Sequence, residues 1–222
     1  MTALVLQARI DSSRLPGKSL LPLGGRPLVF RVMEALSFLP TDKKILACPE
    51  DTASSFAQLA EEAGFSLLPG PKEDVLARYC LAIRSSGADR IIRATADNPF
   101  VFVDAAAALN SEAEELAADY ACYFGIPYGA GVESVASEAL SRAEKEAKDP
   151  AEREHVCLYL YRHHELFRLH RPLAPNRWQG PEISLTVDTA DDYERAQLLF
   201  ERLSSLSREE RNLGRNVIAS YR

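Results

Sequence analysis

The chain has 222 residues, 46% hydrophobic and 26% charged, which predicts a single compact domain with room for a small appendage. Its formal net charge of −6 argues against broad binding to nucleic acid or anionic membranes. The sequence has no basic leader and no stretch of ~20 apolar residues, so we expect neither a signal peptide nor a membrane span. Cys48, Cys80, Cys122 and Cys157 are widely spaced, which argues against a zinc site or disulfides and predicts buried free thiols in the cytoplasm.

Strand and helix patterns alternate through the first half of the chain. Short apolar runs predict strands, and amphipathic segments that end near glycine or proline predict helices. In chain order these are a strand at Thr2–Ala8, a helix at Pro27–Leu39, a strand at Lys44–Cys48, a helix at Asp51–Ala63, a strand at Phe65–Leu68, a helix at Glu73–Ser86 and a strand at Arg90–Ala94. This alternation predicts βαβ units and an α/β fold with a mostly parallel sheet.

The pattern changes after about residue 118. The expected elements are a strand at Asp119–Phe124, a loop at Ile126–Gly131, helices at Ser134–Lys148 and Ala151–His164, strands at Phe167–Arg171 and Ile183–Val187 around a loop at Pro172–Pro181, and helices at Asp191–Leu206 and Arg208–Tyr221. No linker composition separates this part, so we expect one domain, 1–222, in which about 119–182 forms a subdomain or a dimer arm.

A basic loop follows the first strand. Arg9, Arg14 and Lys18 place three cations at the carboxyl end of that strand, where open α/β sheets bind ligands. Cations and flexible backbone amides form a cradle for a polyphosphate, although solvated side chains are the alternative explanation. The Gly17-Lys18 pair resembles the end of a P-loop, but Ser12 stands where that motif requires glycine, which excludes a P-loop NTPase.

Two aspartates each follow a predicted strand. Asp97 and Asp188 come at strand ends. A turn or a helix cap is the favoured explanation for Asp97 taken alone, and a helix cap is the alternative for Asp188. Capping is the favoured explanation for Asp191 or Asp192. Mg²⁺ usually takes one or two carboxylates together with substrate phosphates. Two aspartates at a sheet edge beside a basic loop therefore predict phosphoryl or nucleotidyl transfer.

Four further residues are candidate ligand contacts, and each also has a structural explanation. Asp74 and Arg78 open a helix after a Pro-Gly-Pro turn and either read a base or ribose or form a capping turn. Arg93 either touches a phosphate or pairs with a buried acid. Trp178 either stacks on a ligand or covers the core.

Four residues are candidate contacts for an acceptor. Glu133 follows a Gly-rich turn, and Glu154 and His155 lie at the start of a predicted helix, where a solvated helix start or a structural histidine is the alternative. Asn98 directly follows the first aspartate of the predicted metal pair.

Taken in order, these motifs resemble the cytidylyltransferases that make CMP-activated acidic sugars, and above all the spore-coat polysaccharide biosynthesis protein F branch. The resemblance covers nearly the whole chain. It rests on Gln7-Ala8-Arg9 through Arg14-Leu15-Pro16-Gly17-Lys18, Glu73-Asp74-Val75-Leu76 with Arg78-Tyr79, Arg93-Ala94-Thr95-Ala96-Asp97-Asn98-Pro99, Arg153-Glu154-His155-Val156, and Thr186-Val187-Asp188-Thr189 with Asp192.

The resemblance implies a doubly wound, Rossmann-like nucleotidyltransferase fold and a homodimer, with acceptor and dimer contacts in about 119–182. It implies catalytic roles for Arg9, Lys18, Asp97 and Asp188, with the triphosphate on the two cations and Mg²⁺ on the two aspartates. The further candidate nucleotide contacts are Gln7, Ala8, Ser13, Arg14, Gly17, Asp74, Arg78 and Arg93. In members of known activity, an acceptor oxygen attacks the α-phosphorus of CTP and pyrophosphate leaves.

Two departures from the family pattern concern the acceptor region. Cys157-Leu158 stands where the spore-coat relatives usually show Thr-Pro, and Ala190-Asp191 replaces the more usual Pro-Glu. The leading prediction is Mg²⁺-dependent transfer of CMP from CTP to an acidic sugar or related acceptor for surface polysaccharide. The alternatives are another NTP or a phosphorylated sugar or alcohol as acceptor, and a non-catalytic nucleotide-binding protein of a glycan pathway.

Overall fold

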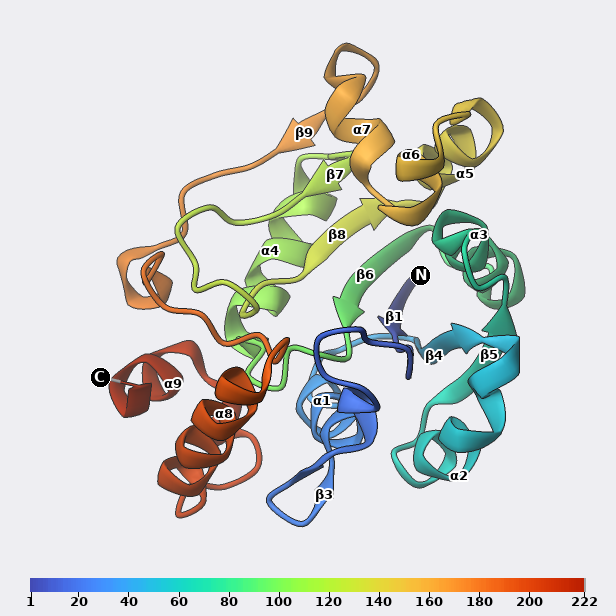
Figure 1. Cartoon of the computed structure of the whole chain (residues 1–222). Coiled ribbons are helices and arrows are strands. Elements are labelled where there is room, and N and C mark those ends of the chain that lie inside the picture. The colour runs from blue at the N-terminus through green and yellow to red at the C-terminus, as the bar shows by residue number, and fades with distance from the viewer. Residues whose placement is uncertain (222) are drawn as a thin grey trace.

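A seven-stranded sheet forms the centre of the computed structural model, which describes residues 1–221 (Figure 1). Its strand order is β5-β4-β1-β6-β8-β7-β9. The strands are β1 Thr2–Gln7, β4 Lys43–Pro49, β5 Ser66–Gly70, β6 Arg90–Thr95, β7 Tyr120–Ala121, β8 Glu133–Ala136 and β9 Leu169–His170, and β2 Pro22–Leu23 with β3 Arg26–Pro27 forms a separate hairpin. Only β8 runs antiparallel to its neighbours in the sheet, so the predicted, mostly parallel α/β sheet is confirmed.

Helices cover both faces because successive side chains of a strand point to opposite sides. Leu4 and Leu6 of β1 face one hydrophobic cluster, and Ala3 and Val5 face the other. The first cluster contains residues of α1 Leu28–Leu36, α2 Ala53–Glu62, α4 Val103–Glu115, α8 Ala190–Leu203 and α9 Gly214–Tyr221. The second contains residues of α3 Val75–Ser86, α5 Ser137–Glu146 and α7 Leu158–Arg162, and α6 Pro150–Glu154 lies against α3.

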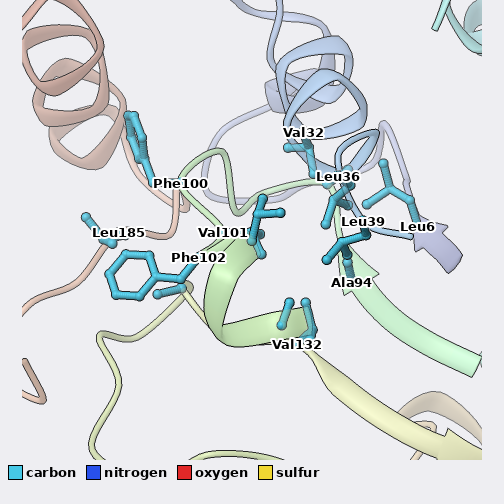
Figure 2. Packing of buried hydrophobic residues seen from close by; sticks show 14 of the residues in the cluster. Leu6, Val32, Leu36, Leu39, Ala94, Phe100, Val101, Phe102, Val132 and Leu185 are labelled. Atoms are coloured by element: carbon cyan, nitrogen blue, oxygen red, sulfur yellow. The ribbon is translucent and has the colours of Figure 1, made fainter. Parts of the chain in front are cut away.

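The packing of the first cluster holds the segment that follows β6. Figure 2 shows Val101 and Phe102 of this segment beside Leu36 of α1 and Leu185 of the segment before α8. Val101 and Phe102 are completely buried. Burial of two such side chains stabilises this turn by about 3–6 kcal/mol, which anchors the loop immediately after Asp97.

Several elements of the second half differ from the sequence prediction. The sequence assigned no element to the alanine-rich run that forms α4. The start of the helix predicted at Ser134–Lys148 is instead β8, because Glu133 and its successors pair with β6 in the register Arg93↔Glu133. Long-range strand pairing therefore overrides the local helix pattern.

Three further boundaries were also predicted incorrectly. The helix expected at Ala151–His164 is divided into α6 and α7, because His155 adopts φ −97° and ψ 86°, outside the helical region. The segment Ile183–Val187 forms an isolated bridge from Ser184 to Tyr128 rather than a strand. The final predicted helix begins as a 3-10 turn at Glu210–Asn212 before α9.

The tryptophan covers the core. Trp178 is 1% exposed, and its indole N–H donates a 2.7 Å hydrogen bond to Asp104 at the start of α4. A stacking role toward a ligand is therefore excluded for this side chain. Within residues 1–221, no helix is both long and apolar enough to cross a membrane.

The topology defines a ligand-binding edge. From β1 the sheet extends through β4 to β5 on one side and through β6 on the other. The loops after β1 and β6 therefore leave the same edge beside the point where the strand order changes direction. Open α/β sheets bind ligands at such a switch point.

Candidate active site

A cleft of about 560 Å³ lies at this edge of the sheet. In Figure 1 the dark blue loop after β1, the green loop after β6 and the orange segment before α8 meet there. The sequence-predicted residues that line it are Gln7, Arg9, Ser13, Arg14, Lys18, Arg78, Arg93, Asp97, Asn98, Glu154, His155 and Asp188. Most of the predicted site is thus brought together from distant segments.

The ammonium of Lys18 joins the two predicted metal ligands. Lys18 is 5% exposed, and its Nζ lies 2.9 Å from Oδ2 of Asp97, 2.7 Å from Oδ1 of Asp188 and 3.0 Å from the carbonyl oxygen of Val187. An ammonium has three N–H donors, so these acceptors use all of them. The two carboxylates compensate the burial of the cation and are held facing one point.

Backbone contacts explain why the two aspartates meet. The N–H of Val187 donates a 2.8 Å hydrogen bond to the carbonyl of Asp97 and fastens the segment before α8 to the loop after β6. Thr189 and Asp192 then form a capping box at the start of α8; the sequence predicted capping for Asp191 or Asp192, and the structure assigns it to Asp192. Asp188 lies between these two anchors.

The turn before Lys18 directs its side chain inward. Gly17 has φ +69°, a left-handed conformation that favours glycine, and its N–H donates to the carbonyl of Ile10 at 3.3 Å. Arg14 stays 64% exposed at its side chain and lies 3.0 Å from Oδ2 of Asp188. Arg9 is exposed and forms no ion pair within the described residues. Two exposed cations, Arg9 and Arg14, therefore border the cleft that contains the buried Lys18.

The carboxyl group of Asp97 is ionised in this setting. Burial alone would raise its pKa, but the charge of Lys18 and hydrogen bonds from Thr95 and Lys18 outweigh burial and lower the pKa. Thr95 donates to Oδ1 of Asp97 at 2.7 Å. The side chain is thus a fixed, charged acceptor at the floor of the cleft.

The pair of aspartates fits a divalent cation that also binds phosphate. Carboxylate oxygens are ligands that Mg²⁺ prefers, and its coordination is commonly completed by substrate phosphates and water. Within residues 1–221, no group of three or more His, Cys, Asp and Glu side chains is placed to hold a metal by itself. Asp97 and Asp188 are therefore suited to a shared site rather than to a closed protein cage.

Unpaired polar atoms also gather at the cleft. Nε of Arg78, Nε of Arg93 and Oδ1 of Asn98 are buried and have no hydrogen-bond partner in the described part of the chain. Such atoms are rare in folded proteins and indicate a missing partner. All three atoms are inaccessible to solvent, as are Nε of Arg26 and Oγ1 of Thr41 away from the cleft, so they do not by themselves identify a ligand.

Comparisons with known proteins agree with this geometry. A family model described as cytidylyltransferase matches residues 3–214. The chain belongs to the cytidylyltransferase family. It is 32% identical over 206 residues to the spore coat polysaccharide biosynthesis protein SpsF of Bacillus subtilis (strain 168), with 89% of this chain and 85% of that protein covered.

Two solved structures support the fold of this cytidylyltransferase. A cytidylyltransferase from Leptospira borgpetersenii superposes with a TM-score of 0.85 at 25% identity, covering 94% of this chain and 89% of its own. The structure of CMP:2-keto-3-deoxy-manno-octonic acid synthetase complexed with CTP has a TM-score of 0.71 at 19% identity and covers 92% and 99%. The chain therefore has a Rossmann-like nucleotidyltransferase fold and is a nucleotidyltransferase.

Four predicted site residues of this cytidylyltransferase do not line the cleft. Ala8 is 1% exposed, and its N–H donates to the carbonyl of Ala47, so it lies beneath the loop. Gly17 acts through its conformation, as described above. Asp74 caps α3 by accepting from the N–H of Ala77 and accepts from Nε of Arg153 at 2.9 Å, which supports the capping interpretation.

Glu133, the fourth, belongs to a buried hydrogen-bond network. It accepts from Tyr120 at 2.7 Å, from Tyr161 and from the guanidinium of Arg93. Burial would raise the pKa of Glu133, but the charge of Arg93 and the two tyrosine hydroxyls lower it. Cys157, one of the departures from the family pattern, also donates to Glu133 at 3.6 Å. Glu133 is therefore ionised and occupied by protein partners.

Of the two alternatives for Arg93, the structure shows the ion pair with an acid, and the contact with a phosphate stays a prediction. Arg93 pairs with Glu133, and its Nη2 also donates to Oε1 of Gln7 at 3.5 Å. It nevertheless lines the cleft with an unpaired Nε. The network thus connects the cleft with the strand edge at β8.

A second pocket of about 360 Å³ adjoins the cleft. Both are lined by Arg93, Thr95, Asn98, Tyr128 and Gly129. Glu133 is part of the wall of this second pocket only. Sequence reasoning missed Thr95 and Tyr128; the position of Thr95 two residues before Asp97 was an available signal, whereas Tyr128 in a loop carried none.

Proposed function

We propose that this chain transfers CMP from CTP to an acidic sugar or a related acceptor, with release of pyrophosphate and with Mg²⁺ as cofactor, for the synthesis of a surface glycan. The observation that carries the proposal is the convergence of Asp97 and Asp188 on the buried ammonium of Lys18, inside a cleft that Arg9 and Arg14 border. Membership of the cytidylyltransferase family supports CTP as the donor.

The triphosphate of CTP is expected to lie against the first loop. Arg9 and Arg14 are exposed cations at its entrance, and the loop also presents Ser13. Charge-assisted hydrogen bonds from such groups are about twice as strong as neutral ones. Because all donors of Lys18 are on protein acceptors, a phosphate oxygen would reach Lys18 only by replacing one of them.

The base is expected to lie toward Arg78. This side chain is 1% exposed, and its Nη1 donates to the carbonyl of Pro71 at 2.6 Å while its Nε is unpaired. Burial lowers the pKa of Arg78, but a guanidinium stays protonated in proteins. Because Arg78 lines the cleft, its guanidinium is the candidate contact for the base.

The chemistry is a displacement at the α-phosphorus. The acceptor hydroxyl loses its proton to water and its oxygen forms the new bond to phosphorus, while the bond from phosphorus to the bridging oxygen breaks and pyrophosphate leaves with that electron pair. Negative charge grows on the leaving group, and the cations of the first loop would stabilise it more in the transition state than in the ground state. Mg²⁺ held by Asp97 and Asp188 would add charge stabilisation and lower the pKa of a bound hydroxyl.

The acceptor is expected in the second pocket, next to Asn98 and Glu133. Its reactive hydroxyl must reach the α-phosphate at the end that the pocket shares with the cleft. Glu154 and His155 lie on the cleft wall at the end of α6 and remain candidate contacts. The homodimer and the role of about 119–182 in it stay predictions, which the mass in solution would test.

The test is thermal stabilisation by CTP, UTP, GTP, ATP and dTTP, each with and without Mg²⁺, followed by pyrophosphate release with candidate acceptors. We expect stabilisation by CTP that depends on Mg²⁺. Preference for another nucleotide would change the donor, and CTP binding without turnover of any acceptor would favour a non-catalytic binding protein. No response to any nucleotide would contradict the proposal.

A further inference from the structure

Each carboxylate oxygen of the two predicted metal ligands already has a protein donor beside it. Oδ2 of Asp97 and Oδ1 of Asp188 accept from the ammonium of Lys18, at 2.9 and 2.7 Å. Oδ1 of Asp97 accepts from the hydroxyl of Thr95 at 2.7 Å. Oδ2 of Asp188 lies 3.0 Å from Nη2 of Arg14. A divalent cation that binds both carboxylates at the point they share must therefore displace a protein group.

The ammonium of Lys18 lies at the point on which these acceptors converge. It also donates to the carbonyl oxygen of Val187 at 3.0 Å, and Lys18 is only 5% exposed. Mg²⁺ lies about 2.0–2.1 Å from its oxygen ligands. Two cations cannot share so small a space, because like charges this close repel strongly where little water separates them. Lys18 and a divalent cation are therefore alternative occupants of one position.

The charges of this group balance one another. Lys18 and Arg14 carry two positive charges and face the two negative charges of the predicted metal ligands. The nearby carboxylate of Asp192 accepts from the N–H of Asp188 and is paired with Arg195. A divalent ion that enters alone must displace a buried ion pair and gains no net attraction from the group.

A triphosphate changes this balance. It brings negative charge into the cleft beside Arg9 and Arg14. The ammonium of Lys18 ends a flexible four-carbon stem and can follow that charge without movement of the backbone. The backbone itself is fixed, because the N–H of Leu21 donates to the carbonyl of Lys18 at 3.1 Å. The hydroxyl of Ser19 donates to the carbonyl of Arg9 at 2.7 Å. Transfer of the ammonium to a phosphate oxygen would free the two aspartates when phosphate is present to complete the coordination of a metal ion.

We propose that Lys18 is an internal counter-ion that competes with the divalent cation for Asp97 and Asp188, so that the metal ion binds together with CTP rather than alone. This rests on the proposed function and gives the lysine a role beyond contact with a phosphate. Metal and nucleotide each raise the affinity of the protein for the other by the same factor. The site thereby rejects free divalent ions and selects the metal complex of the triphosphate.

Binding of Mn²⁺ without nucleotide tests the competition. Mn²⁺ suits carboxylate ligands, and electron paramagnetic resonance measures the free ion. Lys18→Met is expected to bind Mn²⁺ at least about tenfold more tightly than the parent chain, because a cation at the metal position is removed. Mn²⁺ should also raise the melting temperature of this variant more than that of the parent chain. Adding Asp97→Asn should abolish both gains, which locates the ion at the aspartates.

A second variant keeps the buried lysine and so avoids its contribution to the fold. The side chain of Arg14 is 64% exposed, and Arg14→Gln leaves Asp188 with one cation fewer. Its affinity for Mn²⁺ should rise severalfold. Lys145→Met, at an exposed position of α5, is the matched control and should bind Mn²⁺ as the parent chain does.

The parent chain supplies the remaining measurement. Calorimetry at saturating Mn²⁺ and in its absence should show CTP affinity at least about tenfold higher with the ion. Equal CTP affinity in the two conditions overturns the inference. So does Mn²⁺ binding by the parent chain that is as tight as that of Lys18→Met, or an unchanged Mn²⁺ affinity of Arg14→Gln. A parent chain that binds no CTP even with Mn²⁺ would instead contradict the proposed function.

Discussion

Nζ of Lys18 lies 2.7 Å from Oδ1 of Asp188, although 170 positions separate the two residues. The contact joins the loop after β1 to the segment before α8. The same ammonium reaches Asp97 after β6, so one buried cation holds three segments at the site. Removing it should affect both folding and ligand binding.

Lys18→Met is expected to lower the free energy of unfolding by about 2–4 kcal/mol, because it leaves two neighbouring carboxylates without their shared cation. CTP affinity should fall by about 1.5–3 kcal/mol, the range for hydrogen bonds to charged groups. Chemical denaturation and calorimetry measure the two effects. Lys145→Met, at an exposed position of α5, is the control. If adding Asp188→Asn restored no stability, repulsion between the carboxylates would not be the cause.

Asp97→Asn is expected to reduce pyrophosphate release at least about 100-fold, as loss of a transition-state stabiliser does. The fold should persist, because Lys18 keeps Asp188 and Val187 as acceptors. Activity assays and circular dichroism separate these outcomes. Asp191→Asn, an exposed neighbour of the capping box, should leave activity unchanged. A fully active Asp97→Asn protein would remove this residue from the metal site.

Glu133→Gln is expected to destabilise the fold by about 2–4 kcal/mol, since it leaves the buried guanidinium of Arg93 without its anion. Arg93→Met in the same chain should recover part of this loss. The cycle of single and double variants, measured by denaturation, gives the coupling energy. Additive effects would show that the pair is not coupled.

The pH dependence of stability provides a second readout for Glu133. Its folded pKa lies below the ordinary value of 4.5, so its contribution to stability is present above pH 4.5 and is lost as the pH falls through the folded pKa. The groups around it are Arg93, Tyr120, Tyr161 and Cys157. Below pH 4.5 the stability of Glu133→Gln should therefore fall less steeply than that of the parent chain.

Arg78→Met should weaken CTP binding by about 1.5–3 kcal/mol without lowering the melting temperature. The reason is that the buried guanidinium has no carboxylate partner in the described chain and its Nη1 donates only to the backbone carbonyls of Pro71 and Lys72, so the fold gains little from its charge. Calorimetry with CTP and thermal melting test this pair of outcomes. A large loss of stability with normal CTP affinity would assign Arg78 a structural role.

Of the four cysteines, Cys122 should react first with a thiol reagent in the native protein at pH 8. It is half-buried and lines the second pocket, whereas burial raises the pKa of Cys48 to about 11 and that of Cys80 to about 12. Burial also raises the pKa of Cys157. Cys122→Ser should abolish the fast phase seen with a maleimide. A fast phase that survives would show that another thiol is accessible.

Local sequence was sufficient to predict the strands β1, β4, β5 and β6 and the helices α1, α2 and α3, because each is an apolar or amphipathic run recognisable from its own residues. It did not predict the β2–β3 hairpin or α4. The cations of the first loop and the two aspartates were likewise predictable, because their chemistry and their positions at strand ends are properties of short segments.

The tertiary structure alone decided which side chains the site residues contact. Glu133 belongs to β8 and pairs with Arg93 because β8 lies beside β6, a neighbour that no local pattern specifies. Asp74 caps α3 and binds Arg153 rather than facing the cleft. Lys18 donates hydrogen bonds to Asp97 and Asp188, which lie far from it in the sequence. Such contacts could not be predicted locally, because hydrogen bonds and ion pairs depend on distances in space that only the whole fold determines.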